Sequence, residues 1–520
     1  MAPGHTEDVV SIFSPDKPFI IYCQKYWWSD AWEKGAYTPD YDFSRPFFTQ
    51  FRELMEKTPL ASLSSNYSTM INSEYSNWAG DIRNCYLVVD ADYVENSAYG
   101  SGWMHVKECM DCDNIRSSEL CYDSFDLEKC YRTVGSVSCK DSTDLYFSKN
   151  CTGSSNCFGC VNLRNQKYCI FNEQYSKDAY DSKLKEFQTH THEGYTQAKS
   201  AAHGFWLRYP EKYYHGVQNV NVTGDYIYHS KNVKEGYLIT DVEDSKFIAL
   251  THAKSTKDCY DYTDWGEDVQ NIYESSAVGL GGNMVKFSHL IFAGIRDSEY
   301  SYWCKRSSEL FGCVGITDKQ YCILNRQYTK EEYFPMVEKI KKHMEKIPYT
   351  DAGGRIYKYG EFFPQEVAPF CYNESVVQEY FPLTKESAAE KNFTWRDVDP
   401  RNHVVTMQPT EVPSKITEVT DDILKQTMGC EHSGTGCNEK CTEAFRIIPQ
   451  ELAFYRQLGL PLPRLCPNCR HYGRLKHRNP PKLWHRMCMK EGCNNEFETT
   501  YPEDSKAIVF CETCYQQEVA

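Results

Sequence analysis

The chain has 520 residues, a formal net charge of −15 and 25 cysteines. Its length suggests two to four domains, and the acidic excess excludes a protein that coats nucleic acid with its whole surface. Residues 1–13 lack the features of a signal peptide, and no apolar run approaches the ~18 residues of a membrane span. We therefore expect a cytoplasmic protein with reduced cysteines and no membrane contact.

Residues 1–80 form an aromatic-rich N-terminal segment. Residues 14–26 parallel residues 502–514 near the end of the chain, but Tyr26 stands where the tail has Cys514. This segment therefore looks like half of a zinc ribbon that cannot close a metal site alone, and an ordinary β-hairpin fits equally well. Residues 45–57 predict a helix with its apolar side chains inward: Phe47, Phe48, Phe51, Leu54 and Met55.

The next part of the chain contains a duplication without gaps. Residues 158–177 and 311–330 match at eleven of twenty positions, at a constant offset of 153. Each copy runs into a stretch with helical periodicity. The second stretch starts with Thr329 and Glu332 at capping-box spacing, and then places Tyr333, Val337, Ile340 and Met344 on one side.

A shorter repeat lies inside the first copy. Cys85, Cys109, Cys130 and Cys151 recur every 21 to 24 residues, among short strand-like pieces and polar turns. Such a period is typical of stacked solenoids. We predict a mainly β fold: a duplicated, parallel β-helix-like solenoid with halves at residues 81–195 and 196–347, rungs of ~22 residues, and two helices that cap its strand edges.

The solenoid cysteines have two interpretations. Cys109 with Cys112, and Cys157 with Cys160, are CxxC pairs that could bind metal. Because the cysteines recur with the repeat, inward packing as small apolar residues is the simpler account. Two acidic pairs, Asp123 with Asp126 and Asp261 with Asp264, could serve glycan chemistry but also suit turns. His190 and His192 could bind metal but fit a surface pair.

Residues 348–428 form an extended strap, interrupted by prolines, with one short helix near residues 385–391. Residues 429–520 are predicted to be tandem zinc ribbons, because pairs of cysteines recur at the spacing of tetrahedral thiolate sites. The two expected structural Zn²⁺ sites are Cys437, Cys441, Cys466 and Cys469, and Cys488, Cys493, Cys511 and Cys514, with Cys430 as the alternative to Cys437. Pro449 and Gly459 should begin and end a helix within the first ribbon.

A basic stretch joins the two expected zinc sites. Residues 452–490 contain no Asp or Glu, although the whole chain is acidic. We expect nucleic-acid contacts, with Tyr472 and Trp484 as stacking platforms. The alternative is docking on an acidic protein surface, of this subunit or another. The candidate contact residues are Arg464, Arg470, Arg474, Lys476, Arg478, Lys482, Trp484 and Arg486.

Two resemblances support this architecture. The block from Cys437 through Phe445 and Pro463 to Cys466-Pro-Asn-Cys469-Arg470 resembles the probable zinc-ribbon domain family. The chain as a whole resembles an uncharacterised zinc-ribbon and β-solenoid family of uncultivated bacteria. That resemblance rests on residues 42–50, the FGCV…YCI elements, and residues 360–364, 369–374 and 380–385. It implies the architecture but no activity.

We therefore expect a non-enzymatic zinc-binding scaffold whose basic C-terminal ribbons contact nucleic acid, most simply structured RNA. The first alternative is a structural or assembly protein that uses its solenoid and ribbons for protein contacts. The second is a β-helix enzyme acting on carbohydrate, which would need a groove with carboxylates and aromatic side chains.

Overall fold

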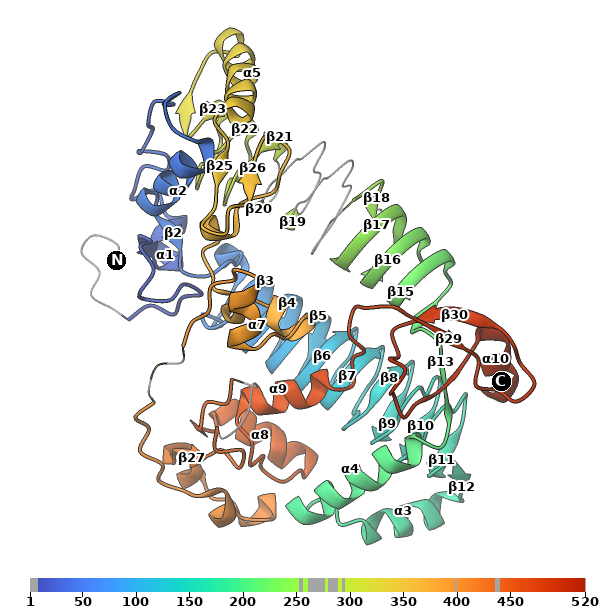
Figure 1. The fold of residues 1–520 in the computed structure, drawn as a ribbon. Helices are drawn as coiled ribbons and strands as arrows, with labels where there is room; N and C mark the ends of the chain where they lie inside the picture. The colour runs from blue at the N-terminus through green and yellow to red at the C-terminus, as the bar shows by residue number, and fades with distance from the viewer. Residues whose placement is uncertain are drawn as a thin grey trace.

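The computed structural model describes residues 8–251, 256–260, 276–278, 289–291, 295–397, 399, 401–434 and 440–519. The protein is mainly β, with several parallel sheets. Figure 1 shows two long runs of short strands, with helices and the C-terminal tail packed around them. The predicted pair Asp261 and Asp264 lies outside the described residues.

The first parallel run contains ten strands. Six form one sheet in chain order, and four form a second sheet in which only the last strand is antiparallel. The strands are β3 (Asn77–Arg83), β4 (Tyr86–Glu95), β5 (Ala98–Lys107), β6 (Met110–Arg116), β7 (Tyr122–Glu128), β8 (Val137–Lys140), β9 (Thr143–Tyr146), β10 (Ser155–Phe158), β11 (Lys167–Ile170) and β12 (Glu173–Gln174).

The register of this run advances by twelve residues per step. One ladder joins Val89, Ser101, Asp113, Phe125 and Val137, each paired with the residue twelve positions further on. The predicted rung of ~22 residues is therefore wrong. The cysteine spacings of 21 and 24 residues suggested that rung length. Both spacings are multiples of three, so they reflect the three-residue local repeat of this backbone and not the length of a rung.

Every third residue from Asn84 to Phe171 has a positive φ. Asn, Asp and Gly tolerate this left-handed conformation best, and they occupy many of these corners. Most residues that follow a corner point inward, and Cys109, Cys112 and Ile115 are fully buried in this way. The four cysteines of the repeat lie a multiple of three residues apart, so all of them face the interior.

Small polar side chains fill the narrow interior because they satisfy its backbone. The N–H of Cys130 donates to Ser118 Oγ at 3.1 Å, and Ser118 Oγ donates to the carbonyl of Arg116 at 2.8 Å. A thiol takes the same place where the N–H of Cys121 donates to Cys109 Sγ at 3.3 Å. Buried N–H groups that would otherwise lack partners are thereby satisfied. The structure agrees with packing as the role of these cysteines.

The second parallel run follows a similar design in the other half of the duplication, but its register advances by 11 to 14 residues per step. Since the offset of 153 is a multiple of three, both copies keep the same inward positions: Cys160 and Cys169 correspond to the buried Cys313 and Cys322. Its strands are β14 (Gly216–Val217), β15 (Val220–Tyr228), β16 (Lys231–Thr240), β17 (Val242–Thr251), β18 (Thr256–Lys257), β19 (Ser276–Val278), β20 (His289–Ile291), β21 (Arg296–Glu299), β22 (Ser308–Phe311), β23 (Gln320–Ile323) and β24 (Arg326–Gln327).

Both runs end in the same device. The side-chain amide of Asn172 accepts from and donates to the backbone of Val161, and Asn325 does the same to Val314. Helices α3 (Lys177–Glu186) and α5 (Lys330–Lys346) follow, and each contacts the last parallel strand of its run. The predicted capping box of α5 is confirmed, as is its buried stripe of Tyr333, Val337, Ile340 and Met344.

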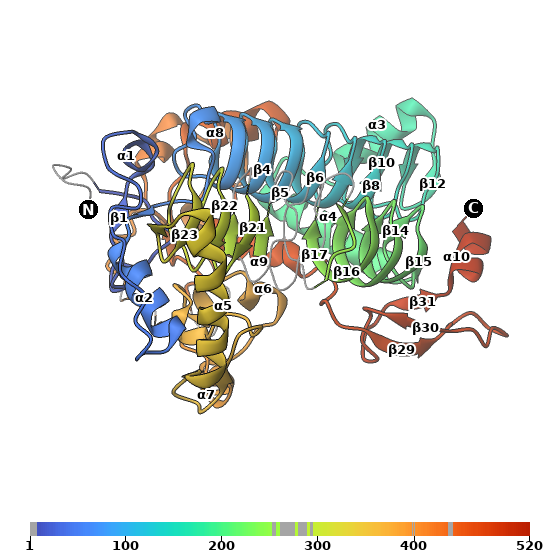
Figure 2. The same cartoon turned by 90° about the horizontal axis from the view of Figure 1, so that it is seen from above.

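The second run returns alongside the first, so that its last strands lie next to the N-terminal segment (Figure 2). The predicted helix in that segment is confirmed as α2 (Phe47–Lys57), and its five apolar side chains are buried. They share one core with Tyr300, Phe311 and Ile340. The segment also contains α1 (Gln24–Trp28), β1 (Ile21–Tyr22) and β2 (Leu60–Ala61).

The remaining elements connect the runs and build the strap and the tail. They are α4 (His192–Trp206), β13 (Pro210–Lys212), β25 (Tyr349–Thr350), β26 (Ile356–Tyr357), α6 (Val377–Tyr380), α7 (Lys385–Glu390), β27 (Met428–Gly429), β28 (Ala444–Phe445), α8 (Pro449–Leu458), α9 (Pro467–Leu475), β29 (Trp484–Met487), β30 (Glu496–Thr499), β31 (Ile508–Phe510) and α10 (Glu512–Val519). The helix expected at residues 385–391 is α7. Within the described ranges, every helix is too short or too polar to span a bilayer.

Candidate metal centres

The tail brings eight cysteine thiols together in two groups of four. Within each group all sulfur atoms lie within 4.8 Å of one another. In the first group, Cys430 Sγ lies 3.9 Å from Cys469 Sγ, and Cys441 Sγ lies 4.0 Å from Cys466 Sγ. Four sulfurs at ~2.3 Å from a tetrahedral ion would be ~3.8 Å apart. The spacing fits a tetrathiolate metal site and is far longer than a disulfide bond.

The first group contains Cys430, the residue that the sequence offered as an alternative ligand. Cys437, the expected ligand, lies outside the described residues. Cys430 follows β27, and Cys441 precedes β28, the strand antiparallel to it. The strand pair therefore carries two thiols to the start of α9, where Cys466 and Cys469 complete the group.

Helix starts supply the paired cysteines of both groups. Cys466 is the N-cap of α9, with Pro467 as its first residue, and Cys511 directly precedes α10. The N-terminus of a helix favours a thiolate because its N–H groups and dipole are directed at the sulfur. Upstream, α8 begins at Pro449 and ends at Gly459, whose φ is +65°, as the sequence predicted.

Backbone donors surround the sulfurs of the first group. The N–H of Thr442 donates to Cys466 Sγ at 3.4 Å, and the N–H of Cys466 donates to Cys430 Sγ at 3.2 Å. Hydrogen bonding from the Cys430 side chain, and then from Thr442, outweighs burial and lowers the pKa of Cys466. The backbone N–H donors of Thr442 and Cys466 favour the charged sulfurs that a metal ion requires.

The second group joins Cys488, Cys493, Cys511 and Cys514, as the sequence predicted. Cys493 Sγ and Cys511 Sγ lie 4.0 Å apart, and the N–H of Cys511 donates to Cys488 Sγ at 3.3 Å. Burial raises the pKa of Cys511, but hydrogen bonds from Cys514 and Asn495 outweigh it and lower this pKa to about 7. Within the chain segments that the structure covers, these two groups are the metal-competent clusters.

Helix α9 inserts two of the predicted basic residues into the first parallel run. Arg474 is 2% exposed, and its Nε and Nη1 lie 2.7 Å from Asp113 Oδ2 and 3.1 Å from Asp111 Oδ1. Arg470 is 8% exposed and pairs with Asp111 at 3.2 Å and with Glu451 at 2.9 Å. The expectation that Arg470 and Arg474 contact nucleic acid is therefore corrected, because both guanidinium groups are buried against the chain's own carboxylates.

The pKa values of the two aspartates in this network shift in opposite directions. Burial, Arg474 and His471 act on Asp113: burial raises its pKa, but the two cations outweigh it and lower the pKa to about 2. Burial dominates at Asp111 and raises its pKa to about 6 despite Arg470 and Arg474. Two cations contact each aspartate, but the nearby carboxylates of Glu451 and Asp123 raise the pKa of Asp111 further.

The other predicted basic residues vary in exposure. Arg464 reaches Glu193 at 3.5 Å, and the guanidinium of Arg478 lies 3.8 Å from the ring of Tyr380. Lys476 and Lys482 are exposed, whereas Trp484 and Arg486 are half-buried. Lys482 Nζ lies 5.0 Å from the ring centroid of Trp484. An aromatic–cation group thus remains at the surface of the second module, by which we mean residues 482–519 with the second group of thiols.

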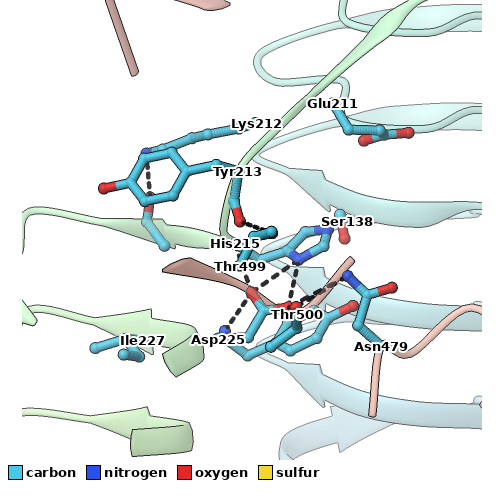
Figure 3. Close-up of polar contacts among 12 residues, drawn as sticks. Ser138, Glu211, Lys212, Tyr213, His215, Asp225, Ile227, Asn479, Thr499 and Thr500 are labelled. Atoms are coloured by element: carbon cyan, nitrogen blue, oxygen red, sulfur yellow. Dashed lines mark hydrogen bonds and ion pairs between the residues drawn. The ribbon is translucent and has the colours of Figure 1, made fainter. Parts of the chain in front are cut away.

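A further cluster, missed by the sequence analysis, joins the second module to the second run. His215 Nδ1 lies 2.9 Å from Asp225 Oδ1, and Thr500 donates to the same carboxylate (Figure 3). Strand β31 extends this junction by pairing in parallel with β13. Thr500 lies 275 residues after Asp225, and β31 is still further along the chain from β13, so no local pattern indicated these contacts between the tail and the second run.

Of the other sequence candidates, Asp123 binds Lys199 and the hydroxyl of Tyr195, and Asp126 accepts from Tyr228. His192 lies at the start of α4. No protein-family model and no curated protein matches this sequence. Among solved structures, a putative acetyltransferase from Desulfovibrio desulfuricans G20 aligns over 57% of this chain and 83% of its own, at 9% identity. Its TM-score of 0.09 carries no argument about fold or function.

Proposed function

We propose that this protein is a non-enzymatic scaffold: a duplicated β-solenoid to which two zinc-ribbon modules are fixed by structural Zn²⁺. The observation that carries the proposal is the pair of four-cysteine groups with tetrahedral sulfur spacing. Sulfur ligands in this number favour zinc, and four protein ligands leave no open position for chemistry. The twelve-residue parallel register and the inward ladder support a solenoid.

In this proposal the metal of the first module also positions the arginines of α9. Cys466 and Cys469 hold the first turn of the helix, and Arg470 follows immediately. A metal bound there would fix the direction of the helix, and hence the alignment of Arg470 and Arg474 with Asp111 and Asp113. Metal binding and docking of the tail on the first run would then be linked.

Metal analysis of purified full-length protein tests the proposal. We expect about two zinc ions per chain, one per four-cysteine group. Cys466→Ser and Cys511→Ser should each lose one ion, and the double variant should lose both. Cys371→Ser is the matched control, because this buried cysteine belongs to neither group and should keep both ions. Metal-free protein, or an unchanged metal content in the double variant, would contradict the proposal.

A second candidate function, nucleic-acid binding, rests on the surface of the second module. Lys482 lies beside Trp484, and Arg486 follows two positions later on β29, so Trp484 and Arg486 share one face of the strand. Such a cation–aromatic group suits a phosphate backbone and an unstacked base. The predicted RNA contact is thereby narrowed to this module, with Lys476 as a further exposed cation.

Fluorescence anisotropy with a structured RNA hairpin and a DNA duplex tests this second candidate. Lys482→Ala with Arg486→Ala should weaken binding at least tenfold and reduce the salt slope by about one for each lost phosphate contact. Arg456→Ala is the control, since this exposed arginine lies on α8, outside the second module, and pairs with Asp421. If both nucleic acids fail to bind at low salt, the assembly alternative is favoured, and size-exclusion chromatography after nuclease treatment would examine it.

A further inference from the structure

A large cavity with a mixed polar and apolar lining lies between the first parallel run and the second. Its volume is ≈ 930 Å³. Strands β6 to β8 form the wall on the first run, and β15 and β16, together with the segment that follows β13, form the opposite wall. Side chains of α10 in the second metal module, including Glu512 and Tyr515, line it as well. The cavity thus lies where three parts of the chain meet, in the size range of ligand-binding pockets of ~300–1,000 Å³.

The charges around the cavity nearly cancel. Arg116, Lys140, Arg164 and Lys212 face the carboxylates Asp126, Glu128, Glu211, Asp241 and Glu512. Several are already paired: Lys140 with Glu128 at 2.7 Å, and Lys212 with Glu512 at 2.7 Å. A strongly anionic or cationic ligand would meet repulsion as well as attraction, and an apolar ligand would strand these polar groups without partners.

Pre-arranged donors and acceptors line the centre of the cavity. Asp126 accepts from Asn114 at 2.9 Å, from Ser138 at 2.8 Å and from the hydroxyl of Tyr228 at 3.1 Å. Arg116 Nη1 donates to Thr240 at 3.0 Å on the opposite run. These bonds hold the polar side chains in place before a ligand arrives, which lowers the entropy lost on binding.

Tyrosine rings and an oriented histidine complete the lining. Tyr213, Tyr214, Tyr228 and Tyr515 each contribute to the wall, and a tyrosine combines an apolar ring with a polar hydroxyl. His215 is fixed by its bond to Asp225 and by stacking on Tyr226, with ring centroids 4.4 Å apart. Figure 3 shows this histidine on the same segment as Lys212 and Tyr213.

We propose that this cavity binds a neutral, hydroxyl-rich ligand of the chemical class of a short oligosaccharide. Sugar hydroxyl groups both donate and accept, which matches a wall that mixes amides, carboxylates and guanidinium groups at near-zero net charge. The apolar faces of sugar rings match the tyrosine rings. This binding function goes beyond the proposed zinc scaffold, and it requires no catalysis.

Isothermal titration of the full-length, metal-loaded protein tests the proposal. The probes are neutral oligosaccharides of two to four glucose, mannose, xylose or N-acetylglucosamine units, together with an oligogalacturonate and inorganic phosphate. We expect at least one neutral probe to bind with a Kd below ~1 mM. Asp126→Asn and Tyr228→Phe should each weaken that binding tenfold or more, because each disturbs the central hydrogen bonds.

Asp144→Asn is the matched control. Asp144 occupies a corner of the first run with the same φ of 57° as Asp126, but it faces Arg132 outside the cavity. It should bind the sugar like the wild type, and circular dichroism melting should show that all three variants fold. The proposal is overturned if no neutral probe binds, if only the acidic probes bind, or if the Asp126 and Tyr228 variants bind as tightly as the control. Metal content, measured on the same samples, tests the zinc scaffold separately.

Discussion

The buried contact between Arg474 and the first parallel run allows a quantitative prediction. In Arg474→Met the side chain keeps much of its length, but Asp111 and Asp113 lose the cation that lies 3.1 Å and 2.7 Å from their oxygens. Arg470 and His471 remain near them, at 3.2 Å and 3.3 Å. Removing one partner of a buried ion pair typically costs about 3–5 kcal/mol, because the other charge stays buried.

Hydrogen exchange on the intact protein measures this cost locally, which is preferable for a chain too large for two-state unfolding. At ~1.4 kcal/mol per tenfold change, exchange in α9 and β6 should accelerate by roughly two to four orders of magnitude. Arg456→Met is the matched control, because its pair with Asp421 is exposed and should contribute ~1 kcal/mol or less. Adding Asp113→Asn to Arg474→Met should recover part of the loss.

The reasoning fails if Arg474→Met accelerates exchange no more than Arg456→Met does. The ion pairs would then add no net stability to the contact between the tail and the first run, as is found for some buried ion pairs when apolar residues replace them. It also fails if exchange rises equally in the second run, since the effect would then be global and not a loss of the contact between α9 and the first run.

Three further predictions follow from the runs and the junction. Ser118→Ala should cost about 1–3 kcal/mol, because the N–H of Cys130 loses its acceptor, whereas Ser118→Cys keeps an acceptor and should cost less; thermal melting compares the two. Gly100→Ala should destabilise by about 1–3 kcal/mol, because its Cβ would lie 2.1 Å from the carbonyl oxygen of Cys112, whereas Gly204→Ala in α4 meets nothing within 4 Å and should be neutral or stabilising. At the junction, burial lowers the pKa of His215, but the effect of Asp225 is larger and raises that pKa. Burial raises the pKa of Asp225, but the effects of His215 and Thr500 are larger and lower that pKa. The contribution of His215 to folding stability is therefore complete below its ordinary pKa of ~6.5 and is lost as pH rises through the raised pKa. The contribution of Asp225 to folding stability is complete above pH ~4 and is lost as pH falls through the lowered pKa. The melting-temperature difference between wild type and Asp225→Asn should be largest between about pH 4 and 6.5.

Each of these has a result that would contradict it. Equal melting of the alanine and cysteine variants at Ser118 would mean that the side-chain acceptor contributes nothing. Equal stability of the two glycine variants would refute the close packing in β5. A difference between wild type and Asp225→Asn that is constant from pH 4 to 9 would show that the two groups are not an ion pair.

Local patterns predicted much of this protein. Each helix expected from periodicity and end signals is present: α2 with its five buried apolar side chains, α5 with its capping box, and α8 between Pro449 and Gly459. Seven of the eight expected cysteine ligands lie in the two groups, and Cys430 was the stated alternative for the eighth. These features succeed because a helix turn, a cap or a CxxC pair is complete within a few residues.

Features that depend on how distant segments meet were not predictable. The rung length was misjudged because a backbone with a three-residue repeat leaves several multiples of three equally visible in the sequence, and only strand pairing selects twelve. The basic stretch looked like a nucleic-acid surface because charge along the chain does not show its partners. Asp111 and Asp113 lie more than 350 residues before Arg474, and tertiary packing alone brings them together.

The amino-acid sequence by itself determined the inward ladder of small residues, the helices and the thiol groups, because each arises from contacts between near neighbours or from a strict repeat. Tertiary structure decided which arginines are buried, where the second module docks and where the cavity between the two runs forms. The physical reason is that an ion pair or a cavity wall depends on distance in space. Because the second run folds back along the first, residues far apart in the sequence can lie close together, and their separation along the chain does not predict that distance.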